Sequence, residues 1–154
     1  MKNLGFNVPV FGTSATCTED VITLSGKTSK IYVGASPYSS WYEDSQGMTK
    51  VREISMKYDP GAEKSYRLKG YILGWVIPEI LCEGLRRAGK DLDGERLVGA
   101  LETIKDFDTR GLCGLITYTP TRHYGLNYNK LFKADPDSGK LIPITDWRLP
   151  PSKK

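Results

Sequence analysis

The longest periodic stretch of the sequence spans residues 65–88 and predicts a helix of about seven turns. Apolar side chains recur there at spacings of three and four, which gathers them on one broad face. That face holds Leu68, Tyr71, Ile72, Trp75, Val76, Ile80, Leu81 and Leu85. Pro78 lies inside the stretch and removes one backbone donor, so we expect a kink there. An apolar face this wide has to be covered by other elements of the fold.

Short β-rich runs precede this helix. Residues 8–14, VPVFGTS, form an apolar run that glycine interrupts, and residues 30–36 form a second run that Pro37 ends. Between the two runs, Thr16 and Glu19 have the spacing of a capping box and predict a short helix. Strand, helix, strand is the beginning of an α/β fold with a parallel sheet.

The rest of the pattern predicts two helices, one strand and a closing antiparallel hairpin. These elements cover residues 48–58, 94–104, 114–119, 126–134 and 141–147. Asp93 is the expected N-cap of the second helix, and the turn-forming run DPDSGK joins the two strands of the hairpin.

Composition limits the classes of function. The 154 residues suffice for one domain, and 39% apolar with 26% charged residues is typical of an ordinary soluble globular protein. The net charge is +4, but the basic residues are spread along the chain, whereas nucleic-acid binders gather them on one face. We therefore expect no nucleic-acid partner. No apolar run is long enough for a transmembrane helix, and the first residues lack the apolar core of a signal peptide.

Signals of catalysis and metal binding are missing. The chain contains no GxGxxG, GxxxxGK[ST], GxSxG or HExxH motif. Its only histidine, His123, sits in a predicted turn, and we interpret it as a scaffold residue that forms hydrogen bonds. Two carboxylate pairs, Glu43 with Asp44 and Asp106 with Asp108, lie in predicted loops and are expected to be solvated. We expect no catalytic residue, no metal and no cofactor.

The three cysteines, Cys17, Cys82 and Cys113, have no zinc-site spacing. We expect free thiols buried as small hydrophobic groups, with a disulfide between two of them as the alternative.

Two stretches are better suited to holding a ligand. The first is the loop GTSAT, residues 12–16, which follows a predicted strand and precedes a predicted helix. In an open α/β sheet ligands bind at this edge, and the hydroxyl and backbone N–H groups there can hold a carboxylate. Plain helix capping is the alternative interpretation. The second is Tyr66 at the start of the long helix, an aromatic residue that can wall a pocket or simply pack in the core.

These stretches together resemble the C-terminal part of the type 1 periplasmic binding proteins. More narrowly, they are similar to the leucine/isoleucine/valine-type receptors of ABC transporters. The resemblance covers roughly residues 4–149 and is most specific over residues 65–127, SYRLKGYILGWVIPEILCEGLRRAGKDLDGERLVGALETIKDFDTRGLCGLITYTPTRHYGLN. The runs VPVFGTSAT, YVGASPYSSW and KLIPITDW support it.

The resemblance implies an α/β fold with two Rossmann-like lobes that close on a ligand between them. It further implies that this chain is a fragment of such a receptor. Residues 1–35 would belong to lobe two, and residues 36–124 would supply helices and a strand of lobe one together with hinge crossings. Residues 125–149 would form the C-terminal hairpin of lobe two, and residues 150–154 a disordered tail.

The resemblance also implies a function. The parent protein would be a periplasmic or extracellular receptor, not an enzyme, which delivers a branched-chain amino acid or an aromatic or other carboxylate to the membrane permease of an ABC importer. Ligand contacts carry over to Ser14 and Ala15, more weakly to Thr16, and to Tyr66. Some members have an acidic residue in the loop for an α-ammonium group, and here that loop is neutral.

Two further expectations accompany this interpretation. The fragment would expose sheet edges and helix faces, so we expect a homodimer or a swapped assembly. The alternative function is a ligand-sensing regulatory or interaction domain of the same fold.

Overall fold

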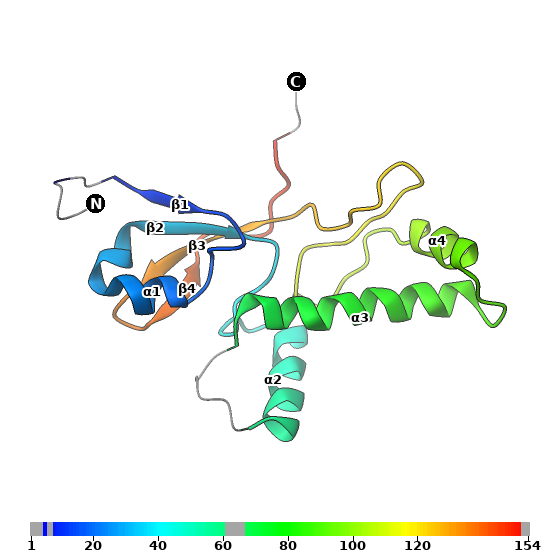
Figure 1. Cartoon of the computed structure of the whole chain (residues 1–154), viewed down its shortest axis with the longest axis horizontal. Coiled ribbons are helices and arrows are strands. Elements are labelled where there is room, and N and C mark those ends of the chain that lie inside the picture. The colour runs from blue at the N-terminus through cyan, green and yellow to red at the C-terminus, as the bar shows by residue number, and fades with distance from the viewer. Residues whose placement is uncertain (1–4, 6–7, 61–66, 152–154) are drawn as a thin grey trace.

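The computed structural model describes residue 5, residues 8–60 and residues 67–151. The chain folds into a sheet with short helices beside it and a separate group of three longer helices, joined by extended segments (Figure 1). The elements are β1 (Val10–Gly12), α1 (Asp20–Ser25), the 3-10 helix η2 (Gly26–Ile31), β2 (Tyr32–Ser36), α2 (Gln46–Tyr58), α3 (Lys69–Ala88), α4 (Gly94–Glu102), β3 (Lys130–Asp135) and β4 (Lys140–Pro143). We call β1, α1, η2, β2, β3 and β4 the sheet half, and α2, α3 and α4 the helical half.

The sheet is mixed, in the order β1-β2-β3-β4. β1 and β2 are parallel, as the strand-helix-strand pattern predicts, and β2 ends at the residue before Pro37. β3 and β4 form the predicted antiparallel hairpin, and β3 also pairs with β2. In the hairpin turn Asp135 accepts hydrogen bonds from the Ser138 hydroxyl and the Asp137 N–H.

One face of the sheet carries the core of the sheet half. Its buried apolar members come from the loop before α1, from α1 and from the strands: Cys17, Ile22, Tyr32, Phe132, Ala134 and Leu141. Gly34 on β2 lies directly against Cys17, because a Cβ atom at this glycine would be 2.6 Å from the Cys17 Sγ. This close approach lets the chain before α1 lie flat on the strand.

The helical half has a core of its own. It is formed by Trp41, Met48, Val51, Ile72, Val76, Leu112, Cys113 and Ile116. The Ser45 side chain caps α2, and the Asp93 side chain accepts from the Arg96 N–H at 2.8 Å, which confirms the predicted N-cap of α4. α3 runs through Pro78 and ends at Gly89, whose φ of 81° suits glycine. None of the described helices is long and apolar enough to cross a membrane.

Several sequence predictions differ from the structure. α3 begins at Lys69 rather than at residue 65, and residues 61–66 lie outside the described residues. Leu81 of the predicted apolar face is exposed. Residues 114–119 form no regular strand, because only isolated bridges form there, from Ile116 to Phe107 and Leu126 and from Thr119 to Arg122. A strand requires a neighbour that pairs over several residues, and no described segment does so here.

Extended segments around residues 36–45, 125–131 and 144–148 connect the two halves. Asn129 and Arg148 exchange backbone hydrogen bonds of 2.9 Å, which hold the second and third segments together. Glu43 of the first segment forms an ion pair with Lys130 of the second, and both side chains are largely buried. The prediction of a solvated Glu43 was therefore wrong, because the folded chain brings a lysine from 87 positions away to meet it. Asp44 is exposed, as predicted.

The tight contact at Gly34 gives a prediction with an internal control. A Cβ atom at Gly34 would also lie 2.8 Å from the Cys17 Cβ. A Cβ atom at Gly74 on α3 would have no neighbour within 4 Å apart from the adjoining residues and the backbone of its own helix. We expect Gly34→Ala to lower the free energy of unfolding by about 1–3 kcal/mol through overpacking. Gly74→Ala should raise it by about 0.5–1 kcal/mol through helix propensity. Urea denaturation measures both, and two changes of the same sign would contradict the packing described.

Candidate functional site

The predicted ligand loop is a surface turn at the end of β1. The Thr16 N–H donates to the Thr13 carbonyl at 3.0 Å, and the side chains of Ser14, Ala15 and Thr16 are exposed. The Tyr32 hydroxyl donates to the Thr16 carbonyl at 2.7 Å and lies 3.1 Å from the Thr16 hydroxyl. The Tyr32 side chain of β2 thus fixes the turn, and Ser14 and Ala15 are exposed to solvent.

The capping box predicted for Thr16 and Glu19 is not formed. α1 begins at Asp20, Glu19 itself is the N-cap, and no side chain caps the helix. The Thr16 hydroxyl donates to the Thr13 carbonyl at 3.2 Å, so it holds the turn together instead of the helix. Because Thr16 belongs to the turn, the Glu19 side chain does not reach back to it and enters the core.

Glu19 is one of two charged residues that are buried within the part of the chain that the structure describes. Its side chain is 1% exposed, and both carboxylate oxygens lack a hydrogen-bond partner. The other is Lys69, the first residue of α3, which is 4% exposed and whose ammonium group also lacks a hydrogen-bond partner. Burying a charge without a hydrogen bond is unfavourable by roughly several kcal/mol. Buried charged side chains without a hydrogen-bond partner are therefore rare in folded proteins.

The two charges lie close enough to influence each other. Burial raises the pKa of Glu19, and the Lys69 ammonium opposes that shift. Burial lowers the pKa of Lys69, while the nearby Cys17 and the carboxylates of Glu19 and Glu43 oppose it. The Lys69 Nζ lies 3.9 Å from the centre of the Phe132 ring on β3, a cation–π contact. The Lys69 side chain thereby reaches from α3 to the core of the sheet half.

The structure therefore brings together two of the stretches singled out in the sequence, the loop of residues 13–16 and the beginning of α3. Tyr66 itself lies outside the described residues. Sequence reasoning missed Lys69 and assigned Glu19 only to capping. One signal was available for Lys69, because a cation is disfavoured in the first turn of a helix, where the macrodipole is positive.

The other candidate residues have scaffold roles. The His123 Nε2 lies 2.8 Å from the Glu102 Oε1, which agrees with a hydrogen-bonding histidine. The cysteines are free, and Cys17 and Cys113 are buried while Cys82 is exposed on α3. Asp108 accepts from the Arg110 N–H in an exposed loop. Across the residues that the structure describes, no group of histidine, cysteine, aspartate and glutamate could hold a metal ion.

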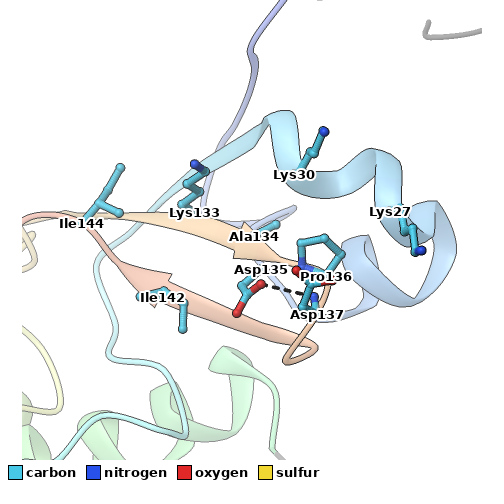
Figure 2. Close-up of a pocket in the computed structure, with 9 residues that line it drawn as sticks. All are labelled: Lys27, Lys30, Lys133, Ala134, Asp135, Pro136, Asp137, Ile142 and Ile144. Atoms are coloured by element: carbon cyan, nitrogen blue, oxygen red, sulfur yellow. Dashed lines mark hydrogen bonds between the residues drawn. The ribbon is translucent and has the colours of Figure 1, made fainter.

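An open pocket of about 540 Å³ lies elsewhere on the sheet half. Figure 2 shows Lys30 of η2 and Lys133 of β3 extending toward the same side, with Lys27 further along η2 and Asp135 bonded within the hairpin turn. Its lining includes none of the predicted ligand residues. The pocket combines three lysines with Asp135 and Asp137 and is separate from the loop of residues 13–16.

Comparison with known proteins shows which solved structures share this fold. The chain matches no protein-family model and no curated protein by sequence. Among solved structures it is similar to a branched-chain amino acid ABC transporter protein of Thermus thermophilus with bound valine, at 24% identity and a TM-score of 0.81 over 97% of this chain and 41% of that one. It is also similar to an ABC transporter substrate-binding protein of Aeropyrum pernix, at 20% identity and a TM-score of 0.79 over 98% and 40%. A third similar structure is a fatty acid ABC transporter substrate-binding protein of Thermomonospora curvata, with 16% identity and a TM-score of 0.73 over 97% of this chain and 39% of that one.

The chain thus has the fold of part of an ABC transporter substrate-binding protein, and the α/β fold class predicted from the sequence is confirmed. The chain spans about 40% of the length of these proteins, as expected for a C-terminal portion. The neighbours are transport proteins that bind substrates, not enzymes.

Burial of Glu19 predicts a dependence of stability on pH. Because its pKa is raised above the ordinary 4.5, the folded chain holds a proton that the unfolded chain has released. Stability from this group is therefore greatest below the unfolded pKa and falls as pH rises through the folded pKa. We expect Glu19→Gln to reduce that fall as the pH rises above about 4.5, measured by urea denaturation. Parallel curves for the two proteins would show that Glu19 is not buried as a carboxylate.

Proposed function

We propose that this chain is the C-terminal part of a two-lobed receptor that captures a small organic ligand for an ABC importer. The observation that carries the proposal is the match of nearly the whole chain to substrate-binding proteins at TM-scores of 0.73 to 0.81. In this proposal the sheet half contributes to lobe two and the helical half to lobe one. The receptor works in the periplasm or outside the cell and passes its ligand to a membrane permease.

The division of the chain into two cores supports a hinged mechanism. Each half has a hydrophobic cluster of its own, and extended segments connect them. Segments of this kind can absorb a rotation of one half against the other, and closure around a ligand buries it between the halves. Residues 1–35 and 125–149 would move with lobe two, and residues 36–124 with lobe one and the crossings.

The ligand in this proposal is a branched-chain amino acid or another small carboxylate. The neighbours support this class, since one was solved with bound valine and another is described as a fatty acid transporter protein. Ser14, Ala15 and Thr16 would contact the ligand from lobe two, because the loop is exposed and rigidly held by Tyr32. Tyr66 would contact it from lobe one. A regulatory or interaction domain of the same fold is the alternative, and it would lack a permease partner.

A thermal-shift screen tests the proposal. The panel contains valine, leucine, phenylacetate and octanoate, applied to residues 1–154 alone and to the whole gene product that contains them. We expect a dose-dependent rise in melting temperature for at least one compound with the whole product and none with residues 1–154. Stabilisation of residues 1–154 alone would contradict the division of the site between two lobes, and no response in either would reject the proposed ligand class.

A second prediction concerns self-association of residues 1–154. An open groove between α3 and α4 is lined mainly by apolar side chains, of which Ile77, Leu81 and Val98 are 54%, 44% and 47% exposed. We expect two copies to cover these grooves mutually, since contiguous apolar surface of this kind favours association. Light scattering should show a dimer that the double variant Ile77→Lys, Leu81→Lys converts to a monomer. A monomeric unaltered chain would contradict this.

A further inference from the structure

The open pocket of about 540 Å³ on the sheet half is bounded by segments that are far apart in the sequence. η2 contributes Lys27 and Lys30 to its lining, whereas the hairpin of β3 and β4 contributes Lys133 (Figure 2). Small-molecule sites in proteins have volumes of about 300–1,000 Å³, so the pocket can hold a small organic compound. Its lining shares no residue with the ligand contacts of the proposed function, so it would serve a different ligand.

The fold of η2 brings its two lysines to the pocket. Residues three apart in a 3-10 helix lie on the same side, and Lys27 and Lys30 have this spacing. The Ser29 side chain between them is 2% exposed, and its hydroxyl donates to the Gly26 carbonyl at 2.7 Å. η2 also packs beside β3. Both lysines therefore start from backbone positions that are fixed relative to the sheet.

Lys133 approaches the pocket from the strand side. Its neighbours on β3, Phe132 and Ala134, are buried in the core, so Lys133 points to the opposite face of the sheet. Directly across the hairpin it is paired with Ile142, which shares that face. Ile142 and Ile144 are 42% and 49% exposed and also line the pocket. The lysine therefore stands beside an apolar wall.

The positive charge of the three lysines is not compensated by ion pairs. Within the ranges that the structure describes, none of the three lies within ion-pair distance of a carboxylate. Asp135 and Asp137 also line the pocket, but the Asp135 carboxylate accepts from the Ser138 hydroxyl and the Asp137 N–H. These hydrogen bonds, with a smaller contribution from Lys133, hold the pKa of Asp135 below its usual range. The charge of Asp135 is thus directed into the hairpin turn, and the lysines are left for an anion.

We propose that this pocket binds a phosphate monoester with a short apolar substituent: the lysines of η2 and β3 donate to the phosphate oxygens, and Ile142 and Ile144 contact the substituent. A phosphate monoester carries a charge of about −1.5 to −2 near neutral pH, and its oxygens point in different directions, so ammonium groups from separate elements can each reach one. The lining contains no arginine, whose planar fork suits a carboxylate. The site lies within residues 1–154 alone and therefore does not depend on the proposed function.

Three compounds separate the contribution of the phosphate from that of the apolar wall. Butyl phosphate has both groups, pentanoate carries a carboxylate on the same butyl chain, and inorganic phosphate has no chain. Their affinities for residues 1–154 are measured by NMR titration of the backbone amides. We expect butyl phosphate to bind at least about threefold more tightly than either of the others and to shift the amides of η2 and of the hairpin. Equal affinity for pentanoate, or shifts spread over both halves, would contradict the proposed site.

The variants are Lys30→Gln, Lys133→Gln and the matched control Lys105→Gln, an exposed lysine that follows α4. Each of the first two should weaken butyl phosphate by about twofold to fivefold, as expected for exposed charge pairs, and the control should leave its affinity unchanged. Asp137→Asn should tighten it by about twofold, because a repelling carboxylate is removed. Loss of structure cannot produce such a gain, so this variant separates binding from folding. Equal losses in the control, or no gain with Asp137→Asn, would overturn the inference.

Phosphate monoesters occur both free in solution and as lipid headgroups, and vesicles distinguish the two sources. Sedimentation is measured with vesicles of phosphatidylcholine alone and with vesicles that also contain phosphatidic acid. Binding that requires phosphatidic acid and is lost in the double variant Lys30→Gln, Lys133→Gln supports a lipid source, whereas binding of butyl phosphate without vesicle binding supports a soluble ester. A chain that binds neither rejects the site, and the thermal-shift panel decides separately whether the proposed function stands.

Discussion

The contact of the Lys69 side chain with the Phe132 ring governs how the two halves of this molecule meet. Each half has its own core, and the side chains that cross between the halves include Lys69, on the Phe132 ring, and Lys140, on the Tyr42 ring. Lys69 is unusual among them because it is buried in a core to which its own helix does not belong. The ring contact recovers part of the hydration that the ammonium group loses, and the remainder is a standing penalty that the fold tolerates.

Local chemistry in the sequence was sufficient to predict most elements of the fold. The turn-forming run DPDSGK predicted the hairpin of β3 and β4, and Asp93 predicted the start of α4, because both depend on residues close in the chain. The parallel pairing of β1 with β2 also followed from a short strand-helix-strand pattern. Such features are encoded within a few residues, and the resemblance to the binding proteins extended them to the α/β fold.

Features that depend on distant residues were missed. Glu43 looked like a loop charge because nothing near it in the sequence announces Lys130. The run GLITYT alternates like a strand, but the alternation does not reveal whether a partner strand lies beside it, and only isolated bridges form, at Ile116 and Thr119. Glu19 has the spacing of a capping residue. Its burial follows only from the structure, in which the Thr16 hydroxyl bonds to the Thr13 carbonyl and lies beside the Tyr32 hydroxyl instead of capping α1. Tertiary context decided each of these cases.

The cysteines provide a natural route to observing motion between the halves. Cys17 is wedged against Gly34, and burial raises the pKa of Cys113 to about 11, so neither thiol is available to an electrophile near neutral pH. Cys82, by contrast, stands exposed midway along α3, in the half opposite the sheet. A maleimide dye would therefore attach at one position of the unmodified chain, and fluorescence from that dye could report rotation of α3 without any engineered residue.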